Sequence, residues 1–113
     1  MPFVGIVIDD KVTSHQANEL RDKLVGLLAE LTGKSSKWFM TSTILADVKL
    51  DGEPAAFVDF RYLGEISKET REKIAEMVAS LFEEEVDIPS GQVYMTFCET
   101  DRDKWAWNGS LFG

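Results

Sequence analysis

The second residue, Pro2, is the first candidate for chemistry in this 113-residue sequence. A small residue at this position favours removal of Met1, and the chain would then begin with a secondary amine. An α-amino group has a pKa of about 8, and apolar burial or a nearby cation lowers it toward neutrality. A general base works best when its pKa lies near the working pH. Pro2 is therefore a candidate general base, although proline is also a tolerable first residue of a strand.

A cation and several aromatic residues could complete a site around Pro2. Lys34 follows Gly33, and its ammonium could either pair with a substrate carboxylate or simply favour the C-terminus of a helix. Aromatic side chains usually fill cores, but they can also line a pocket. The candidates are Trp38, Tyr94, Trp105, Trp107 and Phe112. Because chain termini are normally polar and frayed, the apolar end of this chain predicts a segment that docks on the domain.

The composition argues against several other kinds of site and partner. The only histidine is His15 and the only cysteine is Cys98, which argues against a zinc centre, a Ser-His-Asp triad and a disulfide. The net charge of −8 repels phosphate, so we expect no nucleic acid partner. No apolar run approaches the roughly 20 residues of a membrane span. Asp9 and Asp10 follow the apolar start, so we expect no signal peptide and a cytoplasmic protein without metal or cofactor.

The elements that must position these residues follow in the order β-α-β-β-α-β, within one domain covering residues 1–113. Strands are expected at 3–8, 38–45, 55–63 and 93–98. Thr13 and Gln16 form a capping-box pattern for a first helix, which Gly33 ends. Ser67 begins a second helix, and Asp51–Gly52 marks a turn.

The two halves of the sequence resemble each other. A shift of 54 residues places the cap Thr13 on the cap Ser67, and a shift of 55 places residues 39–41 (Phe, Met, Thr) on residues 94–96 (Tyr, Met, Thr). We interpret the halves as duplicated β-α-β units with right-handed crossovers, although any two such units share part of this periodicity. The predicted fold is α/β (α+β), with a four-stranded, mainly parallel sheet and two helices on one face. Because the strands carry apolar residues on both faces, a second copy of the chain is expected to cover the other face.

Several of these residues occur in the order and spacing that one protein family shows. They are Pro2, residues 32–34 (Thr, Gly, Lys), Leu63 with Gly64, Tyr94 and residues 107–112 (Trp, Asn, Gly, Ser, Leu, Phe). Over nearly its whole length the chain resembles the macrophage migration inhibitory factor family of the tautomerase superfamily, which includes D-dopachrome tautomerase. The resemblance implies the duplicated architecture, a homotrimer whose three sheets form an inner barrel, and a cofactor-independent isomerase.

The resemblance also implies a role for each site residue. Pro2 would be the catalytic base that interconverts keto and enol forms of a small aromatic or enolisable carboxylate, such as phenylpyruvate or dopachrome. Lys34 would hold the substrate carboxylate and lower the pKa of Pro2, and the backbone N–H of Leu63 would bind the same carboxylate. The pocket walls would be Trp38, Trp107, Phe112 and, from a neighbouring subunit, Tyr94.

The sequence departs from the family pattern at several positions. Thr96 stands where an asparagine is common, so a hydrogen bond to substrate would be weakened or rerouted. Ala55 and Val58 replace the CxxC of the vertebrate cytokine, which removes the basis for thiol-oxidoreductase activity. Tyr62 replaces a small residue at the expected pocket mouth and could narrow the site.

Two alternative interpretations stay open at this point. The chain could be a non-catalytic cytokine-like protein that binds a receptor, with leaderless secretion as in the family and Pro2 as a relic. It could also be a ferredoxin-like ligand-sensing domain, which has the same order of elements. The second alternative predicts an antiparallel sheet and gives Pro2 and the apolar end of the chain no role.

Overall fold

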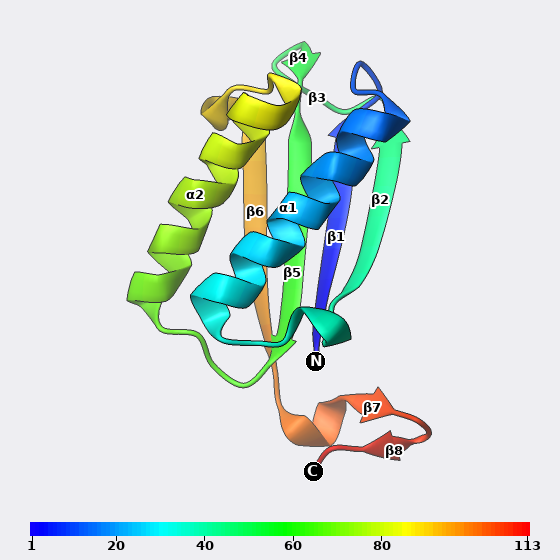
Figure 1. The fold of residues 1–113 in the computed structure, drawn as a ribbon, viewed down its shortest axis with the longest axis vertical. Coiled ribbons are helices and arrows are strands. Elements are labelled where there is room, and N and C mark those ends of the chain that lie inside the picture. Colours follow the sequence, from blue (N-terminus) through cyan, green and yellow to red (C-terminus); the bar gives the residue numbers. More distant parts are fainter.

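The computed structural model describes residues Met1–Gly113 and contains a four-stranded sheet with both long helices on one face (Figure 1). Its long elements are β1 (Pro2–Asp9), α1 (Ser14–Thr32), β2 (Met40–Ala46), β5 (Ala56–Leu63), α2 (Lys68–Val86) and β6 (Val93–Thr100). The strand order is β2-β1-β5-β6. Strands β1 and β2 are parallel, β5 and β6 are parallel, and the central pair β1 and β5 is antiparallel. The predicted fold class is confirmed, and the two parallel pairs contradict the ferredoxin-like alternative.

Short elements complete the chain. They are the 3-10 helices Ser36–Trp38, Ser90–Gln92 and Arg102–Lys104, and the two-residue strands β3 (Lys49–Leu50), β4 (Glu53–Pro54), β7 (Ala106–Trp107) and β8 (Ser110–Leu111). The predicted turn at Asp51–Gly52 joins β3 to β4, and both of its residues have positive φ. Strands β7 and β8 form a hairpin that lies beyond the end of the sheet where β1 begins (Figure 1).

The register of the central strands agrees with the duplication predicted from the sequence. Gly5 of β1 pairs with Asp59 of β5, and these two residues are separated by the same 54 positions that relate the two halves. Each half is one β-α-β unit with a parallel pair of strands, and the halves meet along the antiparallel pair.

The helices begin and end as their sequences predict. The side chain of Thr13 accepts a hydrogen bond from the Gln16 backbone N–H (3.1 Å), and the Gln16 side chain accepts one from the Thr13 N–H (3.0 Å). Gly33 ends α1 with φ of 73°. Ser67 caps α2 through the backbone N–H of Thr70, and Asp87 ends that helix in the left-handed conformation, which the sequence did not predict.

The core lies between the helices and the sheet. On this face the central strands bury Val4, Ile6, Ile8, Val58, Phe60 and Tyr62, and the helices bury Leu20, Leu24, Leu28, Ile74, Val78 and Phe82. Each large apolar side chain buried in this way contributes about 1.5–3 kcal/mol relative to exposure. Tyr62 is fully buried here, so the prediction that it narrows the mouth of a pocket is wrong.

The second strand begins later than the sequence predicted. Residues 36–38 form a 3-10 turn, in which the Ser35 hydroxyl accepts a hydrogen bond from the Lys37 backbone N–H, and β2 starts only at Met40. Trp38 therefore precedes the sheet and is free to face the end of β1.

The other face of the sheet is uncovered in the single chain. It carries Met40 and Ile44 of β2, Phe57 of β5 and Tyr94 of β6, which are exposed by 68%, 51%, 38% and 56%. Between these apolar residues, the Arg61 guanidinium contacts the Asp59 carboxylate at 3.1 Å. Monomeric proteins rarely expose apolar residues in one contiguous patch, so this face is suited to contact with another protein surface.

Candidate active site

A largely apolar cavity of about 360 Å³ lies at the N-terminal end of β1. Residues from the start of β1, from the turn before β2 and from β7 with the residue before it line this cavity. They include Pro2, Phe3, Trp38, Met40, Trp105 and Trp107. The fold brings these residues together because β2 is parallel to β1, so both strands start at the same end of the sheet. The hairpin β7–β8 packs at that end.

The aromatic residues of the C-terminal segment dock on this cavity, as the sequence predicted. The rings of Trp38 and Trp107 meet edge to face, with centroids 5.7 Å apart. Phe112 stacks on Trp107 with centroids 6.4 Å apart, so it supports the wall without lining the cavity. The Arg102 guanidinium donates to the Phe112 carbonyl at 3.1 Å, which fixes the end of the chain.

The terminal amine lies close to the cavity and to Lys34. Pro2 is buried, and Met1 is half-buried. Burial lowers the pKa of the Met1 amine below its ordinary value, and the charge of Lys34 lowers that pKa further. Removal of Met1 would make the nitrogen of Pro2 the new terminal amine, and Pro2 is more buried than Met1.

Lys34 and Leu63, which the family resemblance assigned to one substrate carboxylate, lie within hydrogen-bond distance of each other. The Lys34 ammonium donates a hydrogen bond to the Leu63 carbonyl oxygen at 3.2 Å. Lys34 lies in the loop after α1, and Leu63 lies at the end of β5. These two segments meet at the end of the sheet where β1 begins. Lys34 makes no ion pair with an acidic residue, so its charge is available to an anionic ligand.

Tyr94 and Thr96 lie far from Pro2 of the same chain. Tyr94 pairs with Phe57, Phe57 pairs with Val7, and Val7 is five residues along β1 from Pro2. At about 3.3 Å per residue and about 4.8 Å per strand, Tyr94 is roughly 19 Å from Pro2, far beyond the reach of its side chain. Both residues lie on the uncovered face, and neither lines this cavity in the single chain.

The sequence model of the family described as macrophage migration inhibitory factor (MIF) matches residues 1–113. The chain belongs to this family. Solved structures agree with this result: a MIF homologue from Prochlorococcus marinus is 30% identical, with a TM-score of 0.86 over 98% of this chain and 99% of that one. A MIF-like protein from Entamoeba histolytica is 22% identical, with a TM-score of 0.88 over 98% of both chains. The protein Pt0534 shares the fold at 11% identity, with a TM-score of 0.86 over 97% of this chain and 94% of that one.

Within this MIF-family fold, Lys37 is a cavity residue that the sequence analysis missed. Its ammonium lies 5.1 Å from the centroid of the Trp38 ring, at the rim of the cavity. The signal was available, because Lys37 directly precedes an aromatic residue already assigned to the pocket. Phe3 and Met40 were missed because both were assigned only to strands.

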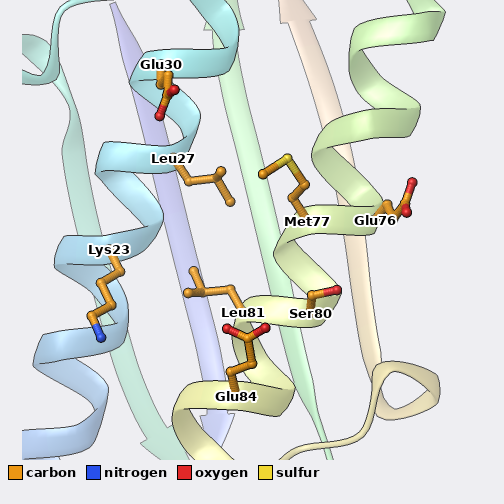
Figure 2. Close-up of a pocket in the computed structure, with 8 residues that line it drawn as sticks. All are labelled: Lys23, Leu27, Glu30, Glu76, Met77, Ser80, Leu81 and Glu84. Atoms are coloured by element: carbon orange, nitrogen blue, oxygen red, sulfur yellow. The ribbon is translucent and has the colours of Figure 1, made fainter.

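The largest cavity of this MIF-family chain lies elsewhere, between α1 and α2, with a volume of about 510 Å³. Figure 2 shows Leu27 and Met77 pointing toward each other across it, with Glu30, Glu76 and Glu84 around them. It contains none of the residues that the sequence assigned to chemistry, and it lies on the helical layer, which the sheet separates from the uncovered face. The smaller aromatic cavity beside Pro2 is therefore the candidate active site.

No group of three or more His, Cys, Asp and Glu side chains is arranged to hold a metal ion. None of the helices is both long enough and apolar enough to cross a membrane.

Proposed function

We propose that this MIF-family chain is a keto–enol tautomerase in which Pro2, freed by removal of Met1, acts as the general base. The observation that carries the proposal is the position of the chain's start, buried at an aromatic cavity and next to a lysine that has no acidic partner. Burial and the Lys34 charge both favour the neutral form of an amine at this place, and only a neutral amine can accept a proton.

The proposed reaction moves one proton between carbon and oxygen. In the direction from ketone to enol, the neutral Pro2 nitrogen takes a proton from the carbon next to the carbonyl group. The electrons of that C–H bond form the new C=C bond, and the carbonyl π electrons move to oxygen, which then receives the proton from the Pro2 ammonium and leaves the amine neutral again. The reverse reaction returns the proton from the Pro2 ammonium to carbon. No electron is gained or lost, so the residues of the chain suffice.

The walls of the cavity favour an aromatic 2-oxo acid such as phenylpyruvate as substrate. Trp38 and Trp107 offer ring faces and edges to an aryl group, and Lys34 offers a cation for the carboxylate. The fold relative Pt0534 was crystallised in a form inactivated by 2-oxo-3-pentynoate, which is also a 2-oxo acid. This supports the idea that sites on this fold admit that class of compound.

The proposed enzyme is a homotrimer, because Tyr94 can serve as a pocket wall only from another copy. The exposed apolar residues of the open sheet face supply the contact surface for such an assembly. Members of this family are generally homo-oligomers, which supports the same conclusion.

The test compares the processed chain with a chain extended ahead of Pro2. Intact mass first establishes that Met1 is absent from one sample, and a short N-terminal tag blocks the amine in the other. We expect kcat/KM for phenylpyruvate to fall by about 10²–10⁴-fold in the tagged protein, because general-base catalysis contributes that much. If both proteins react equally fast, Pro2 is not the base. If neither reacts, the receptor-binding alternative becomes the better account of this MIF-family chain.

A further inference from the structure

Another aromatic residue, Tyr62, contacts Lys34 and lies on the strand that pairs with the start of β1. In the antiparallel pair β1 and β5, Tyr62 is the direct partner of Pro2. The Lys34 ammonium lies 5.9 Å from the centroid of the Tyr62 ring. A cation at this distance from an aromatic face is attracted by the electron density of the ring. The ring and the Leu63 carbonyl are thus the two groups that locate the Lys34 charge.

The ring of Tyr62 is itself fixed from two sides. Its hydroxyl donates a hydrogen bond to the Glu99 carboxylate at 3.2 Å, and the same Glu99 oxygen accepts from the Ile66 backbone N–H. The Phe60 ring packs against it with centroids 4.9 Å apart. Burial, together with the Glu99 charge and hydrogen bond, raises the pKa of Tyr62 to about 12. The hydroxyl therefore stays protonated and keeps donating to Glu99 throughout the neutral range.

We propose that Tyr62 is a positioning residue that holds the Lys34 ammonium beside the amine of Pro2. This inference rests on the proposed function, because it concerns how the base of that reaction acquires its properties. A lysine side chain has many rotamers and tends to extend into water. Without an aromatic surface beneath it, the ammonium would spend less time near Pro2 and near a bound carboxylate. Tyr62 thus acts through Lys34 and does not touch the substrate.

The geometry separates this role from ordinary core packing. Phe60 is also fully buried, carries a ring of similar size and lies on the same strand and the same face. Phe60 makes no contact of this kind with Lys34, whereas Tyr62 does. Replacement of either ring by leucine removes core packing, but only the replacement of Tyr62 should change the properties of the amine.

The experiment uses the processed full-length protein and three variants: Tyr62→Leu, Tyr62→Phe and Phe60→Leu. The pKa of the terminal amine is measured by NMR with ¹⁵N-labelled proline, and the KM for phenylpyruvate is measured in parallel. Displacement of the Lys34 charge should raise the amine pKa toward its ordinary value in Tyr62→Leu, because a nearby cation favours the neutral amine. We expect KM to rise by about three- to tenfold in the same variant. The corresponding loss of binding free energy lies between that of an exposed ion pair and that of a hydrogen bond to a charged group. Tyr62→Phe, which keeps the ring, and Phe60→Leu should leave the amine pKa unchanged.

A second measurement tests whether Tyr62 acts through Lys34. In a Lys34→Gln background, Tyr62→Leu should produce no further change in the amine pKa, because the charge that it displaces is already gone. An equal shift in both backgrounds, or an equal shift in Phe60→Leu, would overturn the proposal. So would a folded Tyr62→Leu protein with an unchanged amine pKa.

Two more outcomes are decisive. If Tyr62→Leu does not fold, the Lys34 ε-methylene protons of the parent and of Tyr62→Phe should still show the upfield shift that an aromatic face causes, and its absence would refute the contact. If the parent does not convert phenylpyruvate, the proposed function fails, while the amine pKa still decides whether Tyr62 positions Lys34.

Discussion

Mixing two impaired variants will test whether each active site is built from two copies of the chain. The variants are Pro2→Gly, which weakens the base, and Tyr94→Ala, which removes the aromatic wall. Pro2→Gly keeps a free amine but loses the rigid, more basic ring, so it should slow turnover without unfolding the protein. Loss of an aromatic contact costs about 0.5–1.5 kcal/mol, so Tyr94→Ala should raise KM by up to about tenfold.

The expected recovery follows from the geometry. Tyr94 lies roughly 19 Å from Pro2 of its own chain, so the proposed site would take these two residues from neighbouring copies. In a randomly mixed ring, half of the sites have an intact Pro2, and half of those face an intact Tyr94, so about one quarter of all sites are complete. If both residues came from one chain, no site would be complete, because every chain carries one defect.

The assay is the initial rate of phenylpyruvate tautomerisation, at a substrate concentration below KM, after the two variants are unfolded together and refolded. A matched control pairs Pro2→Gly with Lys34→Ala. Lys34 acts on the terminal amine of its own chain, so this mixture should recover nothing. If the Tyr94 mixture also recovers nothing while forming mixed oligomers by mass, the assignment of Tyr94 to a neighbouring site is wrong.

Two further predictions concern charged residues. Lys34→Ala should raise KM for phenylpyruvate, because hydrogen bonds to charged groups contribute about 1.5–3 kcal/mol. It should also move the inflection of the pH–rate profile upward, because Lys34 lowers the amine pKa, and an unchanged profile would place Lys34 outside the site. Asp9 is almost fully buried, and its carboxylate accepts a hydrogen bond from Lys49 at 2.5 Å, which holds the pKa of that carboxyl below its ordinary value. This stabilisation is present above about pH 4 and is lost as the pH falls through the lower folded pKa. The fall in melting temperature on acidification should therefore be smaller in Asp9→Asn, and an equal fall would contradict this account.

Local signals predicted most of the fold. The helix ends followed from hydrogen-bonding side chains and from Gly33, because a capping box and a left-handed glycine act within one turn. The start of β2 was misplaced because aromatic and β-branched residues favour a strand, whereas the Ser35 hydroxyl and the backbone of residues 36–38 form a 3-10 turn. Strand preference alone could not show that residues 36–38 would form this turn and not the start of the strand.

Only part of the candidate site could be predicted from the sequence. The clustering of Pro2, Trp38 and Trp107 could be expected, because an apolar chain end must dock somewhere. Tyr62 was misplaced, although the sequence held the relevant signal: it shares the parity of Val58 and Phe60 on β5, and those residues face the helices. Its contacts with Lys34 and Glu99 join residues from three separate segments, and no local pattern carries such information.

The placement of the two parts of the site also constrains the symmetry of the assembly. The cavity beside Pro2 opens next to β2, which is one edge of the sheet, whereas Tyr94 lies on β6, which is the other edge. A contact that brings β6 of one copy to β2 of the next uses two different surfaces. Such a head-to-tail contact can repeat around a ring until the ring closes. The proposed cyclic trimer would cover the open apolar face and complete the proposed divided site with one and the same interface.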